Sequence, residues 1–193
     1  ASNRYAVIIS GGINLNKNNY RYWNNSSAIY NVFTKKYGFP KNNIKVLISD
    51  GYDTNEDRLF EHPNFPAFTR YESSPTDLDQ DGIDDVTGAA TLSNVRNIFS
   101  NLKNTLTPND ELFIFLTTHG DYDGRFFITL WGENLYADDF KNMLNGINCK
   151  NIQIVNTTCT SGGFNSIIKS SNRVLAAACR GDESSYPYST FEF

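Results

Sequence analysis

The sequence predicts an α/β protein in which a mainly parallel central sheet is covered on both faces by helices, a three-layer α/β/α arrangement. Short runs of apolar and β-branched residues alternate along the chain with amphipathic helical segments. The run ELFIFLTT at 111–118 is apolar almost throughout, as strands buried on both faces are. With 193 residues the chain is long enough for one well-filled core, so we expect a single domain spanning 1–193.

The elements follow from these patterns in chain order. Ser26 or Ser27 is expected to cap a first helix that Gly38 and Pro40 end. A long polar stretch, 50–90, carries no clear periodicity and reads as a loop insertion. The expected strands are 4–10, 43–49, 111–118, 151–159 and 173–179, the further helices 91–106 and 136–147, and a small hairpin or edge strand 124–132.

Chemistry is expected at one edge of this sheet, because ligands of parallel sheets bind beyond the carboxyl ends of the strands. His119 follows the third expected strand and Cys159 follows the fourth. Neighbouring strands lie about 4.8 Å apart, so the two side chains would be within reach of one another. A thiolate is a nucleophile and a nearby imidazole exchanges its proton, so the pair suggests a catalytic dyad. The glycine-rich continuation CTSGGF offers backbone amides to an oxyanion.

Composition excludes several other classes. The net charge of −4 gives no basic surplus for nucleic acid or anionic lipid. No apolar run approaches the roughly 18 residues needed to span a bilayer. The three cysteines make a disulfide framework unlikely, and Cys149 and Cys179 are expected to be structural and unpaired. His62 reads as an ordinary loop residue.

Five segments in order along the chain resemble the legumain family of cysteine endopeptidases, within the caspase-like fold group. They also resemble, more distantly, metacaspases, gingipains and the catalytic subunit of the GPI transamidase. The resemblance implies a caspase-like fold. The segments are NNYRYW at 18–23, DVTGAATLSNVRNIF at 85–99, TTHG at 117–120, TTCTSGGF at 157–164 and DESSYPY at 182–188.

The resemblance implies a role for each matching residue. Cys159 would be the nucleophile and His119 the general acid and base. Asn19 would orient the histidine ring. The backbone amides of Gly120 and Cys159 would form the oxyanion hole.

It also implies a pocket for the substrate residue that precedes the cut. Arg21 would lie in this pocket, with Ser184 and Ser185 as polar lining. Losing the glutamate that follows the family's cysteine leaves Arg21 less balanced by negative charge, so both Asn and Asp stay open as the recognised residue. The positions that depart from the family pattern are Thr118, which replaces an acid, Tyr22, which replaces a histidine, and Thr160, which replaces that glutamate.

The segment DLDQDGIDD at 77–85 matches the first half of an EF-hand calcium loop. The twelfth position of that loop is Gly88 instead of a bidentate glutamate, so we expect a structural calcium ion bound with modest affinity. Such affinity suits extracellular calcium and therefore a secreted or cell-surface protein, which we expect in a bacterium. The candidate ligands are Asp77, Asp79, Asp81, Asp84 and Asp85.

Together these features predict a cysteine endopeptidase that cleaves peptides or proteins after Asn or Asp. Two alternatives remain open: a peptide ligase or transamidase that uses the same dyad, and a catalytically inactive, calcium-stabilised binding module. The chain stops soon after the pocket segment, where family domains continue, so a C-terminal prodomain or a further chain is also expected.

Overall fold

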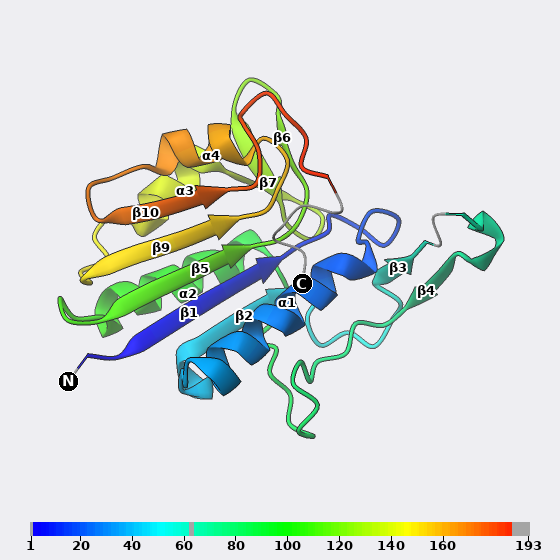
Figure 1. Ribbon diagram of the computed structural model, residues 1–193, viewed down its shortest axis with the longest axis horizontal. Helices are drawn as coiled ribbons and strands as arrows, with labels where there is room; N and C mark the ends of the chain where they lie inside the picture. The colour runs from blue at the N-terminus through cyan, green and yellow to red at the C-terminus, as the bar shows by residue number, and fades with distance from the viewer. Residues whose placement is uncertain (1, 62–63, 187–193) are drawn as a thin grey trace.

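The structure is a computed structural model that describes residues 2–61 and 64–186. Its centre is a five-stranded sheet in the order β10-β9-β5-β1-β2, and every neighbouring pair is parallel (Figure 1). The predicted α/β fold with a parallel central sheet is therefore confirmed. The strands are β1 Arg4–Ser10, β2 Ile44–Ile48, β5 Glu111–Leu116, β9 Asn151–Asn156 and β10 Arg173–Ala177.

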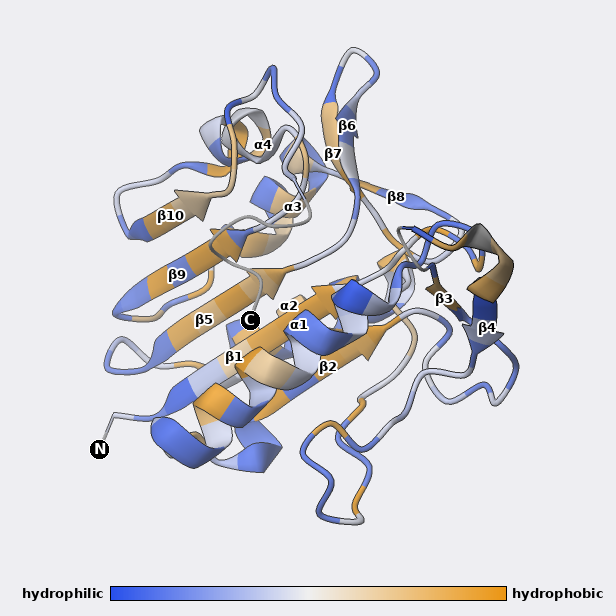
Figure 2. Cartoon of the chain, turned by 45° about the vertical axis from the view of Figure 1, so that its right-hand side comes forward, coloured by the Kyte–Doolittle hydropathy of each residue, from blue (hydrophilic) through white to orange (hydrophobic). Residues whose placement is uncertain are grey.

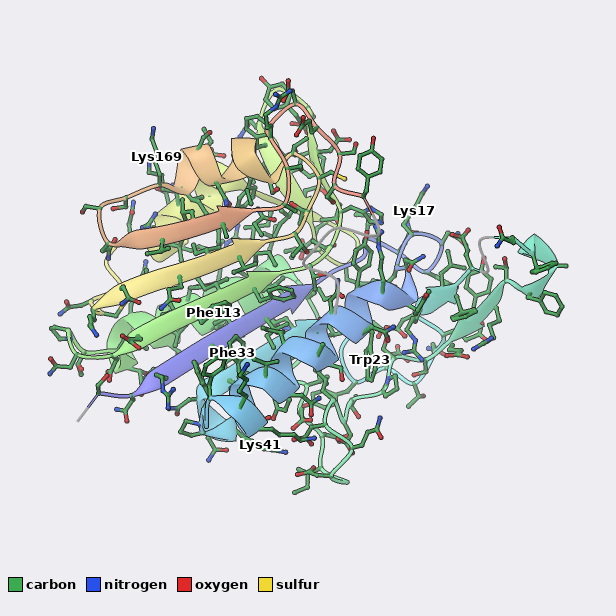
Figure 3. All side chains as sticks on the ribbon, in the orientation of Figure 1. Lys17, Trp23, Phe33, Lys41, Phe113 and Lys169 are labelled. Atoms are coloured by element: carbon green, nitrogen blue, oxygen red, sulfur yellow. The ribbon has the colours of Figure 1, made fainter. Side chains whose placement is uncertain are left out.

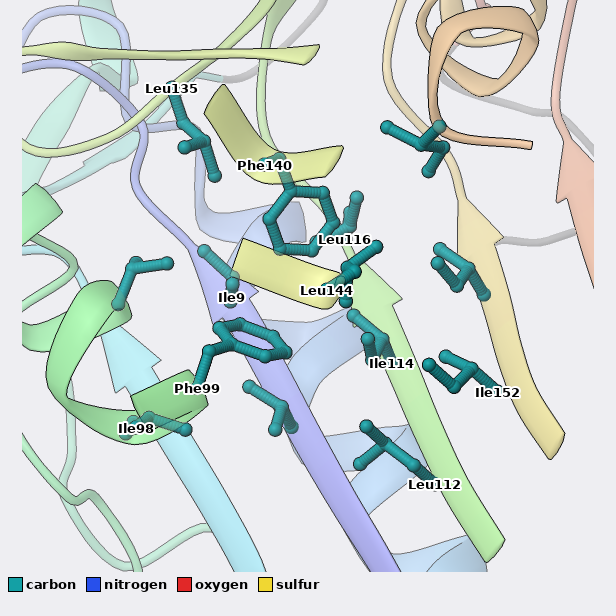
Figure 4. Packing of buried hydrophobic residues seen from close by; sticks show 14 of the residues in the cluster. Ile9, Ile98, Phe99, Leu112, Ile114, Leu116, Leu135, Phe140, Leu144 and Ile152 are labelled. Atoms are coloured by element: carbon teal, nitrogen blue, oxygen red, sulfur yellow. The ribbon is translucent and has the colours of Figure 1, made fainter. Parts of the chain in front are cut away.

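Helices cover both faces of the sheet because successive strand residues point to opposite sides. In β1, Ala6 and Ile8 pack toward helix α1, whereas Val7 and Ile9 pack toward the other face. On this other face, the ring centroid of Phe99 lies 5.2 Å from that of Phe140, and both side chains are buried (Figure 4). The helices are α1 Tyr20–Asn31 on the first face, and α2 Leu92–Thr105, α3 Ala137–Leu144 and α4 Ser161–Ile168 on the second.

Figure 2 shows the consequence of this alternation: the sheet is the most apolar part of the chain, and the helices carry polar residues on their outer sides. Apolar burial on both faces is the main stabilising contribution to such a fold. Among the described residues, no helix combines the length and the apolar character that crossing a membrane requires.

The first helix begins earlier than the sequence suggested, and the expected cap at Ser26 or Ser27 is wrong. Asn19 is the N-cap, and its side-chain oxygen accepts a hydrogen bond from the amide of Arg21. The serine hydroxyls have other partners, since Ser26 donates to the carbonyl of Tyr22 one turn earlier. Tyr22 and Ser26 are buried on the inner face of the helix, and burying this extra turn favours the earlier start.

Three irregular pieces complete the helical part of the chain. A π-helical turn, Val32–Lys36, continues α1, and short 3₁₀ turns occupy Lys41–Asn43 and Pro66–Phe68. Gly38 lies just after the π-helical turn with a positive φ of 62°, which ends the helical segment as the sequence predicted.

Two small antiparallel sheets lie beyond the carboxyl ends of the central strands (Figure 1). The first is a hairpin inside the long polar stretch, in which no strand was predicted. The second contains the strand expected within 124–132, joined by two short partners. The strands are β3 Arg58–Phe60 and β4 Arg70–Glu72 in the first, and β6 Gly120–Tyr122, β7 Phe126–Thr129 and β8 Asn134–Tyr136 in the second.

Candidate active site

The register of two neighbouring strands brings the histidine and the cysteine to the same edge. Leu116 at the end of β5 pairs with Asn156 at the end of β9, and His119 and Cys159 each follow three residues later. The two chains stay together beyond the strands: a Cβ atom at Gly120 would lie only 2.4 Å from the carbonyl oxygen of Cys159. The glycine is therefore required by the close approach of these two segments.

The sulfur of Cys159 faces the segment that follows β10. Its Sγ lies 3.7 Å from the hydroxyl and 3.9 Å from the carbonyl oxygen of Ser185. The next residue, Thr160, has a positive φ of 53° and donates its amide to the carbonyl of Glu183 at 2.8 Å. This sharp turn leads directly into α4, so the thiol lies at the amino end of a helix.

The imidazole of His119 is held from the loop that precedes α1. Nε2 lies 2.7 Å from the carbonyl oxygen of Lys17, and the hydroxyl of Tyr22 lies 3.1 Å from Nδ1 and 3.2 Å from Nε2. A carbonyl oxygen only accepts hydrogen bonds, so Nε2 carries the proton and Nδ1 keeps its lone pair. Within the described chain, no hydrogen bond joins His119 to the sulfur of Cys159.

The histidine is neutral near pH 7. Burial lowers the pKa of His119 below its ordinary value. The hydrogen bond to the Lys17 carbonyl opposes this shift, whereas the positive charges of Arg21 and Lys17 add to it. A neutral imidazole is the form that accepts a proton, so the ring is suited to act as a base in the free protein.

Asn19 and Arg21 lie at the start of α1. The side-chain oxygen of Asn19 serves as the helix cap, and the hydrogen-bond partners of His119 in this region are the backbone carbonyl of Lys17 and the hydroxyl of Tyr22. Arg21 donates from Nη2 to the hydroxyl of Tyr22 at 3.1 Å. The structure therefore links Arg21 to His119 through a tyrosine.

A small pocket lies between the start of α1 and the cysteine. Arg21, Cys159 and Ser185 all line it, whereas Ser184 is exposed and lies outside the lining. The other lining residues are Tyr22, Asn25, Thr117, Thr118, Thr157 and Tyr186.

Thr118, which replaces an acid in the family pattern, has a structural explanation. Its side chain is buried and its hydroxyl accepts a hydrogen bond from the amide of Gly12 at 2.9 Å. The same hydroxyl lies 2.7 Å from that of Thr129 and 3.1 Å from the carbonyl oxygen of this residue. Thr118 thus joins the ends of β1, β5 and β7, and a buried carboxylate here would be costly.

The amide of Gly120 makes no ladder hydrogen bond to β7. Thr129 donates its amide to the carbonyl of His119 at 2.9 Å, and Gly120 pairs with Ile128 in the same antiparallel ladder. Hydrogen-bonded and non-bonded pairs alternate in such a ladder, so the amide of Gly120 points away from β7. The ladder therefore leaves this amide without a partner on β7.

Sequence reasoning did not identify Tyr22 or Lys17 as partners of the histidine. Tyr22 stood out only as a departure from the family pattern, and the signal present was a tyrosine directly after Arg21, a predicted pocket residue. Lys17 acts through its backbone carbonyl, which leaves no signal in the side-chain sequence.

The acidic loop lies apart from the cysteine, on the side of α1. The structure brings the carboxylates of Asp77, Asp79 and Asp85 together, with ligand oxygens within 4.8 Å of one another. Asp81 reaches the cluster through Lys41, which contacts both Asp79 and Asp81. Asp84 lies outside this cluster: its carboxylate accepts from the hydroxyl of Thr76 at 2.5 Å.

Cys149 and Cys179 are not among the residues that line the pocket. Both cysteines carry free thiols. Burial raises the pKa of the Cys149 thiol, which keeps it protonated. His62 lies outside the described residues.

The parallel sheet, with a cysteine and a histidine at its carboxyl edge, has the architecture of a cysteine peptidase. The model of the Peptidase C13 family matches residues 4–191, and the chain therefore belongs to this family of legumain-like cysteine peptidases. The resemblance drawn from the sequence is confirmed, and the fold agrees with the caspase-like fold of the family. A peptidase acts on peptides or proteins, which are the substrate class of this chain. A search of curated proteins found no significant match.

Proposed function

We propose that this peptidase is an endopeptidase that cleaves after Asn or Asp through an acyl-enzyme formed on Cys159. The observation that carries the proposal is the paired register of β5 and β9, with His119 and Cys159 each three residues beyond the last pair. Two polar side chains 40 residues apart in sequence thereby share one sheet edge, beside a pocket that Arg21 lines.

In the proposed reaction, the sulfur of Cys159 attacks the scissile carbonyl carbon and a C–S bond forms. The thiol proton passes to Nδ1 of His119, which the bond from Nε2 to Lys17 leaves as the basic nitrogen. The carbonyl oxygen becomes an oxyanion that accepts hydrogen bonds from the amides of Gly120 and Cys159. His119 then gives its proton to the leaving amine as the C–N bond breaks.

Water completes the cycle. It attacks the acyl carbon while Nδ1 of His119 accepts one of its protons, and the C–S bond breaks to release the new carboxylic acid. The proton on Nδ1 returns to the sulfur of Cys159. In the described part of the free protein no hydrogen bond joins His119 to Cys159. This is compatible with the proposed steps, because catalytic hydrogen bonds commonly tighten only when the substrate is bound.

Tyr22 is proposed to position the histidine. Its hydroxyl accepts from Arg21 and donates to Nδ1, so it fixes the ring while the pocket is empty. A substrate carboxylate or amide bound by Arg21 would compete with the tyrosine for the guanidinium. Filling the pocket would then free Nδ1 for proton transfer, which links recognition of the substrate to activation of His119.

Arg21 supports recognition of Asn or Asp. A guanidinium donates to the amide oxygen of an asparagine and, with charge assistance, to the carboxylate of an aspartate. The hydroxyl of Ser185 lies in the same pocket and offers a further polar contact. A larger hydrophobic residue would cover these polar groups without offering them a hydrogen bond, which disfavours binding of such a substrate.

A set of peptides that differ only at one residue tests the proposal. We expect cleavage after Asn or Asp with kcat/KM at least about 100-fold above that for Ala or Lys at the same position. Cys159→Ala should lower the rate about 1000-fold or more. Cys149→Ser is the matched control, because this buried thiol lies far from the proposed chemistry and should leave cleavage unchanged.

Labelling by a thiol-reactive activity probe separates the alternatives. Labelling of Cys159 without cleavage of any peptide, but with transfer to an added amine, would identify a ligase or transamidase. If the probe does not label Cys159 and no peptide is cleaved, the proposal is contradicted and a binding module is favoured.

A further inference from the structure

The acidic loop, residues 77–85, folds around its own first aspartate. Asp77 accepts the amides of Gln80 at 2.7 Å and Gly82 at 2.8 Å. Asp77, Asp79 and Asp85 occupy the first, third and ninth positions of an EF-hand loop, and these are the three whose oxygens converge. Separations below 4.8 Å fit ligands around one Ca²⁺, whose bonds to oxygen are about 2.3–2.6 Å long.

Asp79 provides an independent sign of a missing ligand. Its side chain is only 4% exposed, and its Oδ1 is buried without a hydrogen-bond partner in the described structure. The other oxygen, Oδ2, lies 2.8 Å from Nζ of Lys41. Burying an ionised carboxylate with one oxygen unsatisfied is costly, and a bound cation would remove that cost.

The charge of the cluster is not balanced by its lysine. Nζ of Lys41 lies 2.8 Å from Asp79, 2.7 Å from Asp81 and 3.6 Å from Asp85. One ammonium therefore faces three carboxylates, and Asp77 adds a fourth. The lysine offsets one of these four charges, so a surplus of about three negative charges remains.

Other groups near the cluster do not supply this charge. Lys35 reaches only the backbone carbonyl of Asp79, at 3.4 Å. The hydroxyl of Tyr30 donates to Oδ1 of Asp85 at 2.6 Å and brings no positive charge. A divalent cation would offset most of the surplus.

We propose that Asp77, Asp79, Asp81 and Asp85 bind one Ca²⁺, and that the ammonium of Lys41 occupies this acidic cluster in the absence of the ion. Calcium is favoured over magnesium because it accepts six to eight oxygen ligands in flexible geometry, whereas Mg²⁺ requires near-ideal octahedral geometry and retains its waters. The twelfth position, Gly88, takes no part: its carbonyl accepts the amide of Ile48 at 3.2 Å. Water and the carbonyl of the seventh position would complete the shell.

The ion would stabilise the contact between the loop and α1. Ser27 donates its hydroxyl to the carbonyl of Leu78 at 2.6 Å, and Trp23 donates its indole N–H to the carbonyl of Pro75 at 2.8 Å. Figure 3 shows Trp23 between Lys17, which lies near the catalytic edge, and Lys41, which lies at the opposite end of the helix. The same helix carries Arg21, so the ion would hold the pocket in place without taking part in the reaction.

Calorimetry and thermal unfolding of the whole chain with CaCl₂ test the site, independently of peptidase activity. We expect a Kd of about 10⁻⁴–10⁻³ M, and a rise in Tm of roughly 3–10 °C at about 10 mM Ca²⁺. The reference is NaCl at equal ionic strength, with MgCl₂ as a second comparison. No heat and no Tm rise, or an equal rise with Mg²⁺, would overturn the proposal.

Three variants locate the ion. Asp79→Asn should weaken Ca²⁺ binding at least about tenfold, and Asp139→Asn, an exposed aspartate of α3, should leave it unchanged. Lys41→Gln should lower the Tm of the calcium-free protein and tighten Ca²⁺ binding, because a competing cation has gone. The two substitutions should change the affinity for Ca²⁺ in opposite directions. A general folding defect would weaken binding in both variants, so it cannot produce this result. Equal affinity in Lys41→Gln and wild type would show that the lysine and the ion do not share the site.

Discussion

The two candidate sites of this protein are built in opposite ways. The carboxyl edge joins residues that are far apart in sequence: Lys17, Tyr22, His119 and Cys159 come from three separate segments. The acidic loop takes all its carboxylates from nine consecutive residues, and Lys41 and Tyr30 reach them from elsewhere in the chain. Figure 1 shows the same contrast. The carboxyl edge lies where several central strands end, whereas the acidic loop is a single continuous segment beside α1.

This difference predicts how each site responds to damage. A site assembled by sheet register depends on the close approach of two backbones, so a small steric change should misplace the reacting groups. A site formed by one loop keeps its ligands together locally, but its position depends on the anchors that attach it to the core. The following experiments, in order of expected effect, test these two expectations.

Gly120→Ala should produce the largest effect. The new methyl group would lie 2.4 Å from the Cys159 carbonyl oxygen and 2.7 Å from the Thr158 hydroxyl, so the two segments must separate. A displacement of about 1 Å is enough to lower a rate about 100-fold, and we expect a loss of at least that size in kcat/KM. Gly88→Ala is the control: its nearest contact is the flexible side chain of Asn94 at 3.2 Å. If both variants are equally active, the close contact between Gly120 and the Cys159 backbone is not required for activity.

Leu78→Ala should mainly affect the acidic loop. The side chain is 1% exposed and lies in the core beside α1, so its truncation should lower the free energy of unfolding by about 2–4 kcal/mol. Ile83→Ala, in the same loop but 65% exposed, should change it by no more than about 0.5 kcal/mol. Urea unfolding of both proteins measures the difference. A similar small effect of both changes would mean that the loop is not anchored by Leu78.

Tyr22→Phe should give the smallest change, seen in the pH dependence. Removing a hydrogen bond donated to Nδ1 destabilises neutral His119, so the pKa of this histidine should rise and the acid limb of kcat/KM should move to higher pH. The wild-type limb should lie below about 6.5, the ordinary value. We expect kcat/KM near neutral pH to change by about two- to tenfold. An unchanged limb would argue against a positioning role.

The same shift has a consequence for stability. The unfolded chain binds a proton at His119 below its ordinary pKa of about 6.5, whereas the folded chain, with its lowered pKa, resists protonation. Stability contributed by the neutral histidine is therefore present above this pH and is lost as the pH falls. His119→Gln should therefore weaken the dependence of the free energy of unfolding on pH below about 6.5. If the variant shows the same dependence as the wild type, His119 is not its cause.

Much of the fold could be predicted because its signals are local. The five central strands were expected from apolar runs. The first was predicted with its observed bounds, and the other four were predicted two or three residues too long, as at Thr117 and Thr157, where polar residues follow. The start of α1 could not be predicted, because an asparagine-rich segment offers several caps and the burial of Tyr22 decided between them. The hairpin β3–β4 lay in a stretch with no periodic pattern.

The sequence by itself determined the chemistry that is present: a cysteine and a histidine after apolar strands, and a calcium-type spacing of aspartates. These are properties of consecutive residues, and local spacing is enough to read them. Only the tertiary structure decided that β5 and β9 are neighbours in matching register, that the Lys17 carbonyl and Tyr22 hold the imidazole, and that Lys41 enters the acidic cluster. These contacts arise from packing between distant segments, whose partners a linear pattern does not specify.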